Sequence, residues 1–321
     1  MLRQFAILME QSTPVIRLSG FPCGDAVIYA GLPNLNPSGS VKDVMAFHML
    51  RRAEERGEIQ PGYTILEVTT GNTGIAFSML ASLCGYRFVA VMPEHMSVER
   101  RQIMKAYGAE VVLTSKESDM PGAIARYEGL KRELAPNVWL PSQFANEDNV
   151  DSHYHTTGSN LLRALPEGVD FFVAGVGTGG TFLGVSRRLR EEYPQCRMIA
   201  IEPAESAVLS GGAAGLHGIQ GIGEGFIPAL IERHRHEIDQ VETVSTAEAE
   251  AMARQLALRS GIFAGVSAGA NITVALRIAQ QYPGARIATL IPDRGERYLN
   301  QGLFGCSPRD CESQRCPVHL P

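Results

Sequence analysis

One lysine in the chain stands where a charged amine is disfavoured and a reactive amine would be useful. Lys42 ends the turn-rich stretch NPSGSVKD (36–43) just as an amphipathic helical pattern begins. A helix N-terminus already supplies positive potential, so an ammonium group placed there is disfavoured. Partial burial in a cleft would lower the stability of the ammonium form further and leave a nucleophilic amine. The position therefore fits either an ordinary solvated lysine or one that condenses with an aldehyde.

A glycine-rich loop in the second half of the chain is typical of a phosphate site. GVGTGGT (175–181) follows the apolar run DFFVA (170–174) and precedes a helical pattern. Glycines let the backbone approach a ligand, and the free N–H groups at a helix N-terminus favour a phosphate. A purely structural turn is one alternative. A dinucleotide loop is another, but its spacing is G-x-G-x-x-G and Glu202 would have to bind the ribose. A P-loop is excluded because no Gly-Lys-Ser/Thr follows.

A second loop of the same kind lies nearer the N-terminus. TTGNTG (69–74) also links an apolar run to a helical pattern, and Asn72 adds an amide to its hydroxyl groups. A plain helix cap would explain this loop taken alone. The two loops and Lys42 together suit a ligand with a phosphate at one end and a carboxylate at the other. The aldehyde cofactor that carries a phosphate is pyridoxal 5'-phosphate.

Apolar runs and amphipathic stretches alternate along the chain and must position these residues. The expected strands cover 63–68, 87–92, 110–114, 170–174, 197–201 and 286–291. The expected helices cover roughly 41–56, 73–84, 97–107, 120–134, 180–191, 247–260 and 268–280. The strand runs are continuously apolar, as in parallel sheets covered on both faces. We therefore predict an α/β fold with two doubly wound lobes, mostly parallel sheets and a ligand cleft between the lobes. The glycine-rich segment 203–228 is expected as a loop near the mouth of the cleft.

Composition and charge exclude several classes of partner. The 321 residues carry a formal net charge of -5, which favours neither nucleic acid nor an anionic membrane. No apolar run approaches the roughly 18 residues of a membrane span, and the first ten residues do not resemble a signal peptide, so we expect a cytoplasmic protein. Six cysteines, at 23, 84, 196, 306, 311 and 316, do not form a disulfide framework in a chain of this length. The last three, with His319, lack the spacing of a zinc knuckle, so no metal is predicted and 306–321 is expected to be a disordered tail.

Five motifs together resemble one enzyme family. NPSGSVKD, TTGNTG, GVGTGGT, GVSAGA (265–270) and IPDRGERYL (291–299) have the order and spacing of pyridoxal-phosphate-dependent β-replacement enzymes, above all cysteine synthase (O-acetylserine sulfhydrylase). The resemblance extends from Thr13 to Phe304. It implies fold type II, similar to the tryptophan synthase β subunit, and a homodimer. It further implies a smaller, mobile substrate-binding lobe at 41–144 and a larger cofactor-binding lobe at 1–40 plus 145–305.

The resemblance also implies roles for individual residues. Lys42 would hold the cofactor as an internal aldimine and carry the Cα proton, Asn72 would bind the phenolic oxygen, and Ser267 would face the pyridine nitrogen. The phosphate would be held by Gly177, Thr178, Gly179, Gly180 and Thr181, and Asp293 is counted with the cofactor-binding residues. The substrate carboxylate would be held by Thr69, Thr70, Gly71, Thr73 and Gln143.

The neutral hydroxyl group of Ser267 indicates the type of reaction. Unlike a carboxylate, it does not stabilise a protonated pyridine, so the ring is a weaker electron sink and β-elimination is favoured over transamination. The implied substrate is an O-activated L-serine, either O-acetylserine or O-phosphoserine. Lys42 would act in turn as nucleophile, base and acid, and a sulfur donor would add to an aminoacrylate to give L-cysteine.

Departures from the family pattern leave the second substrate open. Asp293-Arg294 resembles cysteine synthase B, which accepts bulkier sulfur donors, whereas HGIQGIGEGFIP (217–228) resembles the A type. SHYH (152–155) resembles siderophore-pathway relatives, although His153 itself is expected to be structural. The main alternative is therefore another β-substituted alanine, of the 2,3-diaminopropionate type, made with an amine nucleophile. A catalytically inactive relative that binds a ligand or partner is the alternative from another class, and a nucleotide-dependent oxidoreductase is a third.

Overall fold

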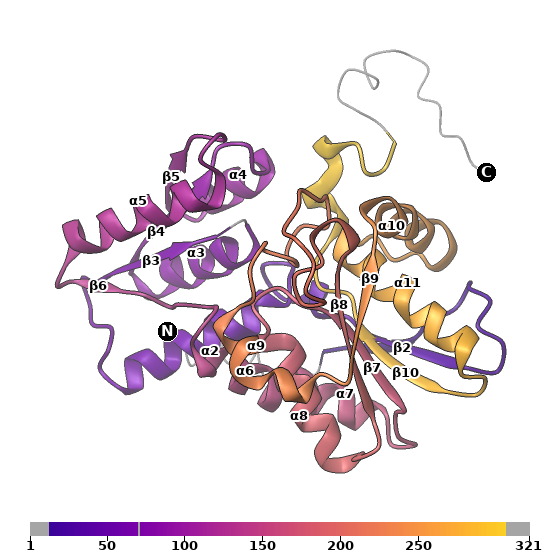
Figure 1. The fold of residues 1–321 in the computed structure, drawn as a ribbon. Coiled ribbons are helices and arrows are strands. Elements are labelled where there is room, and N and C mark those ends of the chain that lie inside the picture. Colours follow the sequence, from indigo (N-terminus) through magenta and orange to yellow (C-terminus); the bar gives the residue numbers. More distant parts are fainter. Residues whose placement is uncertain (1–12, 70, 306–321) are drawn as a thin grey trace.

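The computed structural model describes residues 13–69 and 71–305, and Figure 1 shows two groups of strands, each covered by helices. The larger sheet has the strand order β1 (Val15–Arg17), β2 (Val27–Gly31), β10 (Arg286–Leu290), β7 (Phe171–Gly175), β8 (Arg197–Pro203) and β9 (Gln240–Val244). β1 pairs antiparallel with β2, and the other neighbours pair parallel. The smaller sheet is parallel, in the order β5 (Glu110–Thr114), β4 (Arg87–Pro93), β3 (Thr64–Val68) and β6 (Val138–Trp139).

Helices connect the strands. They are α2 (Lys42–Glu55), α3 (Asn72–Cys84), α4 (Val98–Ala106), α5 (Asp119–Leu134), α6 (Glu147–His153), α7 (Ser159–Ala164), α8 (Gly180–Glu192), α9 (Ala229–His234), α10 (Thr246–Ser260) and α11 (Val266–Gln281). Short 3-10 helices cover Pro33–Leu35, Ala204–Ser206, Arg235–Glu237 and Gly295–Gln301, and a π-helical turn covers Tyr154–Gly158. No helix in the described part of the chain is long and apolar enough to cross a membrane.

The central strands β3 and β4 of the smaller sheet are buried on both faces, which explains why their side chains are mostly apolar. One face packs against α2 and α3 through side chains that include Met45, Met49, Ile65, Phe77 and Trp139. The other packs against α5, with Leu66, Val89 and Leu130 in contact. Trp139, the only tryptophan in the chain, is 6% exposed and packs edge-on against Phe77 at 5.9 Å, in the core of this sheet.

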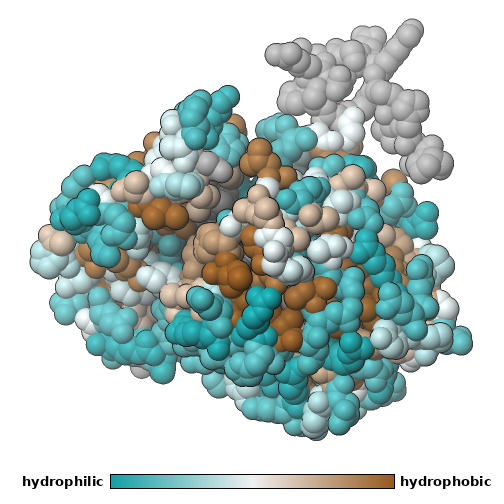
Figure 2. All heavy atoms as spheres, in the orientation of Figure 1, coloured by the Kyte–Doolittle hydropathy of each residue, from teal (hydrophilic) through white to brown (hydrophobic). Residues whose placement is uncertain are grey.

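The larger sheet is covered in the same way. α10 and α11 pack on one face, and α7 and α8 lie on the other, as Figure 1 shows. β1 and β2 come from the start of the chain and join β10 from its end, so this sheet takes strands from both ends of the chain. Figure 2 shows apolar residues gathered near the middle of the viewed face and mostly hydrophilic residues around them.

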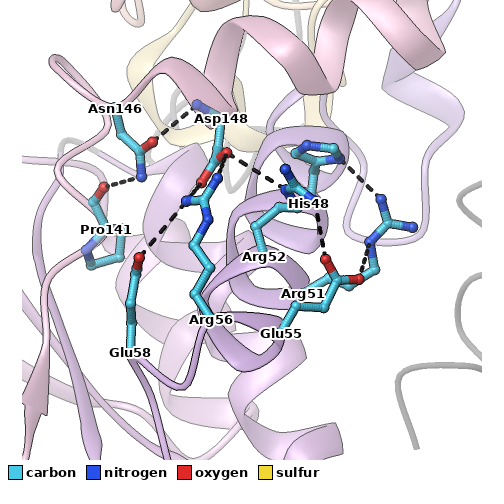
Figure 3. A network of polar contacts seen from close by, with 9 residues as sticks. All are labelled: His48, Arg51, Arg52, Glu55, Arg56, Glu58, Pro141, Asn146 and Asp148. Atoms are coloured by element: carbon cyan, nitrogen blue, oxygen red, sulfur yellow. Dashed lines mark hydrogen bonds and ion pairs between the residues drawn. The ribbon is translucent and has the colours of Figure 1, made fainter.

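A polar network fastens α2 to α6, as Figure 3 shows. Arg56 donates both of its terminal N–H groups to the carboxylate of Asp148, at 2.7 and 2.8 Å. The Asp148 side chain is 5% exposed, whereas that of Arg56 is 44% exposed. Asn146 caps α6 by accepting the Asp148 N–H at 2.9 Å, and it donates to the Pro141 carbonyl group at 3.1 Å. The C-terminal end of α2, the helix that begins at Lys42, is therefore fixed to α6.

The predicted fold class is confirmed, and each of the six predicted strands and seven predicted helices is present within a few residues of its expected bounds. The segment from Ala207 to Pro228 is irregular, as predicted. The strands β1, β2, β6 and β9 were not predicted from the sequence. The expectations for the three C-terminal cysteines, for His319 and for a disordered tail concern residues outside the described ranges. The proposed lobe boundaries stay a prediction.

Candidate active site

The segment that carries Lys42 is held against the residues that follow β10. Val41 donates its N–H to the Pro292 carbonyl group at 2.8 Å, and Ser40 forms an isolated antiparallel bridge with Asp293. The turn before it closes through the Gly39 N–H and the Asn36 carbonyl group at 2.8 Å, with Gly39 at φ +88°. These contacts place Lys42 at the first position of α2, at the wall of a cavity.

That cavity brings together most of the predicted site residues from both halves of the chain. It is lined by Lys42, Thr69, Asn72, Thr73, Gln143, Gly177, Thr178, Gly179, Thr181 and Ser267, among others. It lies beside the carboxyl ends of β3 and β7, where open α/β sheets bind ligands. Gly71, Gly180 and Asp293 do not line it, although each is next in the sequence to a residue that does. Thr70 lies outside the described residues.

Burial favours the neutral form of Lys42. Loss of solvation lowers the pKa of its amine, and the negative charges of Glu224 and Asp293 act in the opposite direction. The net shift is downward, so a larger fraction of the amine is uncharged at neutral pH than for a solvated lysine. This is the behaviour that the sequence predicted for a reactive lysine.

The loop that follows β7 has the shape of a phosphate cradle. A side chain at Gly177 would place its Cβ 2.3 Å from the Gly221 carbonyl oxygen, and one at Gly180 would place it 1.9 Å from Oδ1 of Asn149. Gly179 has φ +93°, which glycine adopts without strain. The loop ends at the N-terminus of α8, whose first N–H groups have no partners within the helix. Backbone amides thus line a tight concavity, which fits the phosphate of pyridoxal phosphate.

Two buried side chains hold this loop in place. Asn149 donates to the Gln143 carbonyl group at 2.8 Å and to Oγ1 of Thr178 at 3.0 Å, so it joins the phosphate loop to a predicted substrate-binding residue. His153 contacts Oγ1 of Thr181 at 3.1 Å and Oγ1 of Thr157 at 2.9 Å through its two ring nitrogens. Burial lowers the pKa of His153 to about 3, so the ring is neutral. These contacts support the structural role expected for His153.

The loop before α3 is also shaped by side-chain hydrogen bonds. Oγ1 of Thr69 accepts the N–H groups of Gly71 at 3.0 Å and Gly74 at 3.2 Å. Thr73 donates to Oε1 of Gln143 at 2.7 Å, and Gln143 donates to the Val68 carbonyl group at 3.1 Å. The hydroxyl and amide groups at the start of α3 are therefore fixed in orientation before any ligand arrives.

A buried charged network orients Asn72. The Asn72 amide donates to Oδ2 of Asp293 at 2.8 Å, and its oxygen accepts from Arg297 at 2.6 Å. Tyr298 also donates to Oδ2 of Asp293, at 2.8 Å, and Arg100 donates to the Tyr298 hydroxyl group at 3.0 Å. Asp293 thus contacts this site through Asn72, and it positions that side chain.

Several residues of the site were missed by sequence reasoning. Arg100 lies in the predicted helix 97–107, where nothing indicated a role in the site, and Asn149 lies in a helix that was not predicted. Tyr298 lies in the motif IPDRGERYL, but no role was assigned to it. Glu224 lines the cavity, and its position in the glycine-rich segment expected near the cleft mouth was an available signal. Glu202, the residue that a dinucleotide loop would need, is 1% exposed and accepts the backbone N–H groups of Leu209 at 2.6 Å and Ser210 at 2.9 Å. Its carboxylate therefore shapes the loop 204–210, which argues against a ribose-binding role.

Comparison with known proteins defines the class. Residues 7–293 match the family described as pyridoxal-phosphate dependent enzyme. A cysteine synthase of Staphylococcus aureus is 44% identical over 296 residues, which cover 91% of this chain and 94% of that protein. The solved cysteine synthase of Entamoeba histolytica superposes with a TM-score of 0.88 at 39% identity, over 94% of this chain and 90% of that one. An O-ureido-L-serine synthase also superposes with a TM-score of 0.88 at 39% identity, over 93% and 94% of the two chains.

The chain belongs to the family of pyridoxal-phosphate-dependent enzymes. It has the fold type II architecture of the cysteine synthases, and its cofactor is pyridoxal 5'-phosphate. The amine in the cavity and the glycine cradle fit that cofactor's aldehyde and phosphate groups.

Proposed function

We propose that the protein catalyses β-replacement on an O-activated L-serine and forms L-cysteine from O-acetylserine and a sulfur donor. The observation that carries the proposal is the amine of Lys42, buried in a cavity between two amide-rich loops, in a chain 44% identical to a cysteine synthase. O-phosphoserine is the second activated serine that the same site could accept.

Four parts of the cavity would hold the cofactor. Lys42 would bind its aldehyde carbon, the loop from Gly177 to Thr181 its phosphate, Asn72 its phenolic oxygen and Ser267 its pyridine nitrogen. When bound, pyridoxal phosphate withdraws electrons from the Cα atom of an attached amino acid. Ser267 is 4% exposed and stands in the first turn of α11, where it offers a neutral hydroxyl group. Such a contact limits electron withdrawal and favours departure of a β-substituent.

The loop 69–73 and Gln143 would hold the substrate carboxylate. The positive end of α3 faces the cavity, and the Thr69 hydroxyl group and the second amide N–H of Gln143 are donors there, while Thr73 orients Gln143. Thr70 and Gly71 belong to the same proposal. Lys42 would remove the Cα proton and later return it, a role that its lowered pKa supports.

The assay is direct. The purified enzyme, loaded with pyridoxal phosphate, is mixed with O-acetylserine and sulfide, and cysteine is quantified by mass spectrometry. We expect rapid cysteine formation that is lost in Lys42→Ala and retained in Lys131→Ala, which changes a lysine outside the cavity. Failure of wild type with both O-acetylserine and O-phosphoserine would refute the proposal. Formation of a β-substituted alanine from an amine, without cysteine from any sulfur donor, would favour the alternative nucleophile.

Two further properties belong to the same proposal. We expect a homodimer, which size-exclusion chromatography with light scattering would reveal, and we expect the segment 41–144 to move as the substrate-binding lobe. The arrangement of β3, β4, β5 and β6 in one sheet supports treating most of that segment as a unit. The cytoplasmic location expected from the sequence stays a prediction.

A further inference from the structure

One carboxylate stands on the path between solvent and Lys42. Glu224 lines the inner cavity, and it also lines a wider outer pocket whose other walls include His95, Leu216 and His217. Met120 and the residues from Gln220 to Ile222 line both spaces as well. Glu224 therefore lies where the outer pocket meets the reaction cavity, and a second substrate that enters by the outer pocket passes it.

The backbone around Glu224 is fixed. Gly223 donates its N–H to the Val176 carbonyl group at 3.1 Å, and its own carbonyl group contacts Nε2 of His217 at 2.7 Å. Gly223 and Gly225 have φ +66° and +80°, and a side chain at Gly223 would place its Cβ 2.5 Å from the ring of Pro203. The two glycines thus permit a tight turn that presents the intervening carboxylate to the cavity.

The Glu224 carboxylate does not hold any other part of the described structure in place. Among the residues that the structure describes, its carboxylate makes no hydrogen bond and no ion pair, in contrast to Glu202 and Asp293. Lys42 and Arg100 are the charged groups that act on it electrostatically. Arg100 already lies 3.9 Å from Asp293, so its charge has a nearer partner. Burial raises the pKa of Glu224 to about 6, and both cations oppose that rise.

Such a carboxylate has a defined effect on incoming molecules. It attracts cations, it can accept a proton from a neutral N–H or S–H group, and it repels anions, all more strongly in a partly buried cavity than in water. A purely structural role does not explain it, because it holds no backbone or side-chain group.

We propose that Glu224 selects the second substrate, binding nucleophiles that arrive with a proton and disfavouring anionic ones. This inference rests on the proposed β-replacement. Lys42 first takes the Cα proton, and acetate leaves the β-carbon with the electron pair of the C–O bond. As the nucleophile's electron pair then forms the new bond to that carbon, its N–H or S–H bond breaks and the proton moves to a carboxylate oxygen of Glu224. Lys42 returns a proton to Cα, and Glu224 releases its own to solvent through the outer pocket. No oxidant or reductant is needed.

The test compares a neutral and an anionic nucleophile in wild type and Glu224→Gln. With O-acetylserine saturating, kcat/KM is measured for pyrazole, which carries an N–H proton, and for thiosulfate, a dianion. We expect Glu224→Gln to lower the value for pyrazole and raise that for thiosulfate, each about tenfold, because the change removes one unit of charge. Glu224→Asp should restore the wild-type order of preference, and Glu232→Gln, an exposed change on α9, should alter neither value.

Binding supplies a readout that does not depend on turnover. In isothermal titration calorimetry, thiosulfate should bind the cofactor-loaded Glu224→Gln variant about tenfold more tightly than wild type. Equal changes for both nucleophiles, or none in kinetics and calorimetry, would overturn the assignment. A different result would refute the proposed β-replacement itself: O-acetylserine would leave the visible spectrum of the wild-type enzyme unchanged. The calorimetric comparison still decides the role of Glu224 in that case.

Discussion

Replacing Asp293 with asparagine removes a buried negative charge while keeping the shape of the side chain. Asp293 is 1% exposed and accepts hydrogen bonds from Asn72 and Tyr298, both at 2.8 Å. Arg100 lies 3.9 Å away and is itself 1% exposed, and Arg297 is 4% exposed beside the same group. In Asp293→Asn, the buried guanidinium groups of Arg100 and Arg297 would lose a negative charge that acts on both of them.

The expected cost follows from that burial. Removing one member of a buried ion pair typically costs about 3 to 5 kcal/mol, because the remaining charge is uncompensated. The amide oxygen of asparagine can still accept both hydrogen bonds, so we expect the lower end, about 3 kcal/mol of the free energy of unfolding. A matched control is Glu133→Gln. Glu133 accepts from Arg126 at 2.7 Å, but the two side chains are 56% and 42% exposed. A solvent-exposed pair of this kind contributes about 1 kcal/mol or less.

Urea denaturation followed by tryptophan fluorescence measures both variants. The single tryptophan, Trp139, lies in the core of the smaller sheet and reports its unfolding. We expect a clearly lower transition midpoint for Asp293→Asn and a nearly unchanged one for Glu133→Gln. If the two variants differed from wild type by the same small amount, Asp293 would not be the counter-charge of the buried arginines. The reasoning about the network around Asn72 would then be wrong.

Two other substitutions test the phosphate loop. Gly180→Ala would place a methyl group 1.9 Å from Asn149 and weaken the binding of pyridoxal phosphate by about 1 to 3 kcal/mol, as measured by absorbance titration. In the control Gly129→Ala, the added methyl group would lie 3.5 Å from its nearest neighbour, so the cofactor should bind as in wild type. Equal affinities of the two variants for pyridoxal phosphate would contradict the phosphate cradle. Burial lowers the pKa of His153 to about 3, whereas the unfolded chain takes up that proton near pH 6.5. Stability should therefore fall below pH 6.5 by up to about 1.4 kcal/mol per pH unit. Urea titrations at pH 7 and pH 5 should show a smaller fall in His153→Gln, and identical falls would refute a neutral buried ring.

Local signals in the sequence were enough to predict most of the fold. The strands at the centre of each sheet are buried on both faces, so runs such as FVAVM (88–92) in β4 are apolar throughout and stand out. β9 was missed because QVETV is half polar and lies at the edge of its sheet, where one side has no partner strand. β6 has two residues and β1 has three, too few to show a period.

The site was predictable only where one short motif supplies both the backbone shape and the side chain. The loops around Asn72 and Gly177 meet this condition, and so does the turn before Lys42. The contacts that orient these groups join distant parts of the chain, such as Asn72 with Asp293, 221 positions apart, and Arg100 with Tyr298, 198 positions apart. No local pattern encodes such pairs, because they exist only when both sheets have formed. The charge of Glu224 was visible in the sequence, but its unoccupied carboxylate is a property of the folded cavity.

The central claim is that Lys42 is the residue that carries the cofactor, and peptide mapping tests it most directly. Borohydride reduction of the loaded enzyme fixes pyridoxal phosphate to its lysine, and proteolysis with mass spectrometry locates the adduct. The chain offers four candidates, at positions 42, 105, 116 and 131, and Lys105 and Lys116 are exposed. We predict a stoichiometric adduct on the peptide that contains Lys42 and its absence in Lys42→Ala. An adduct on another lysine of the wild-type enzyme, or none at all, would contradict the assignment of this cavity as the active site.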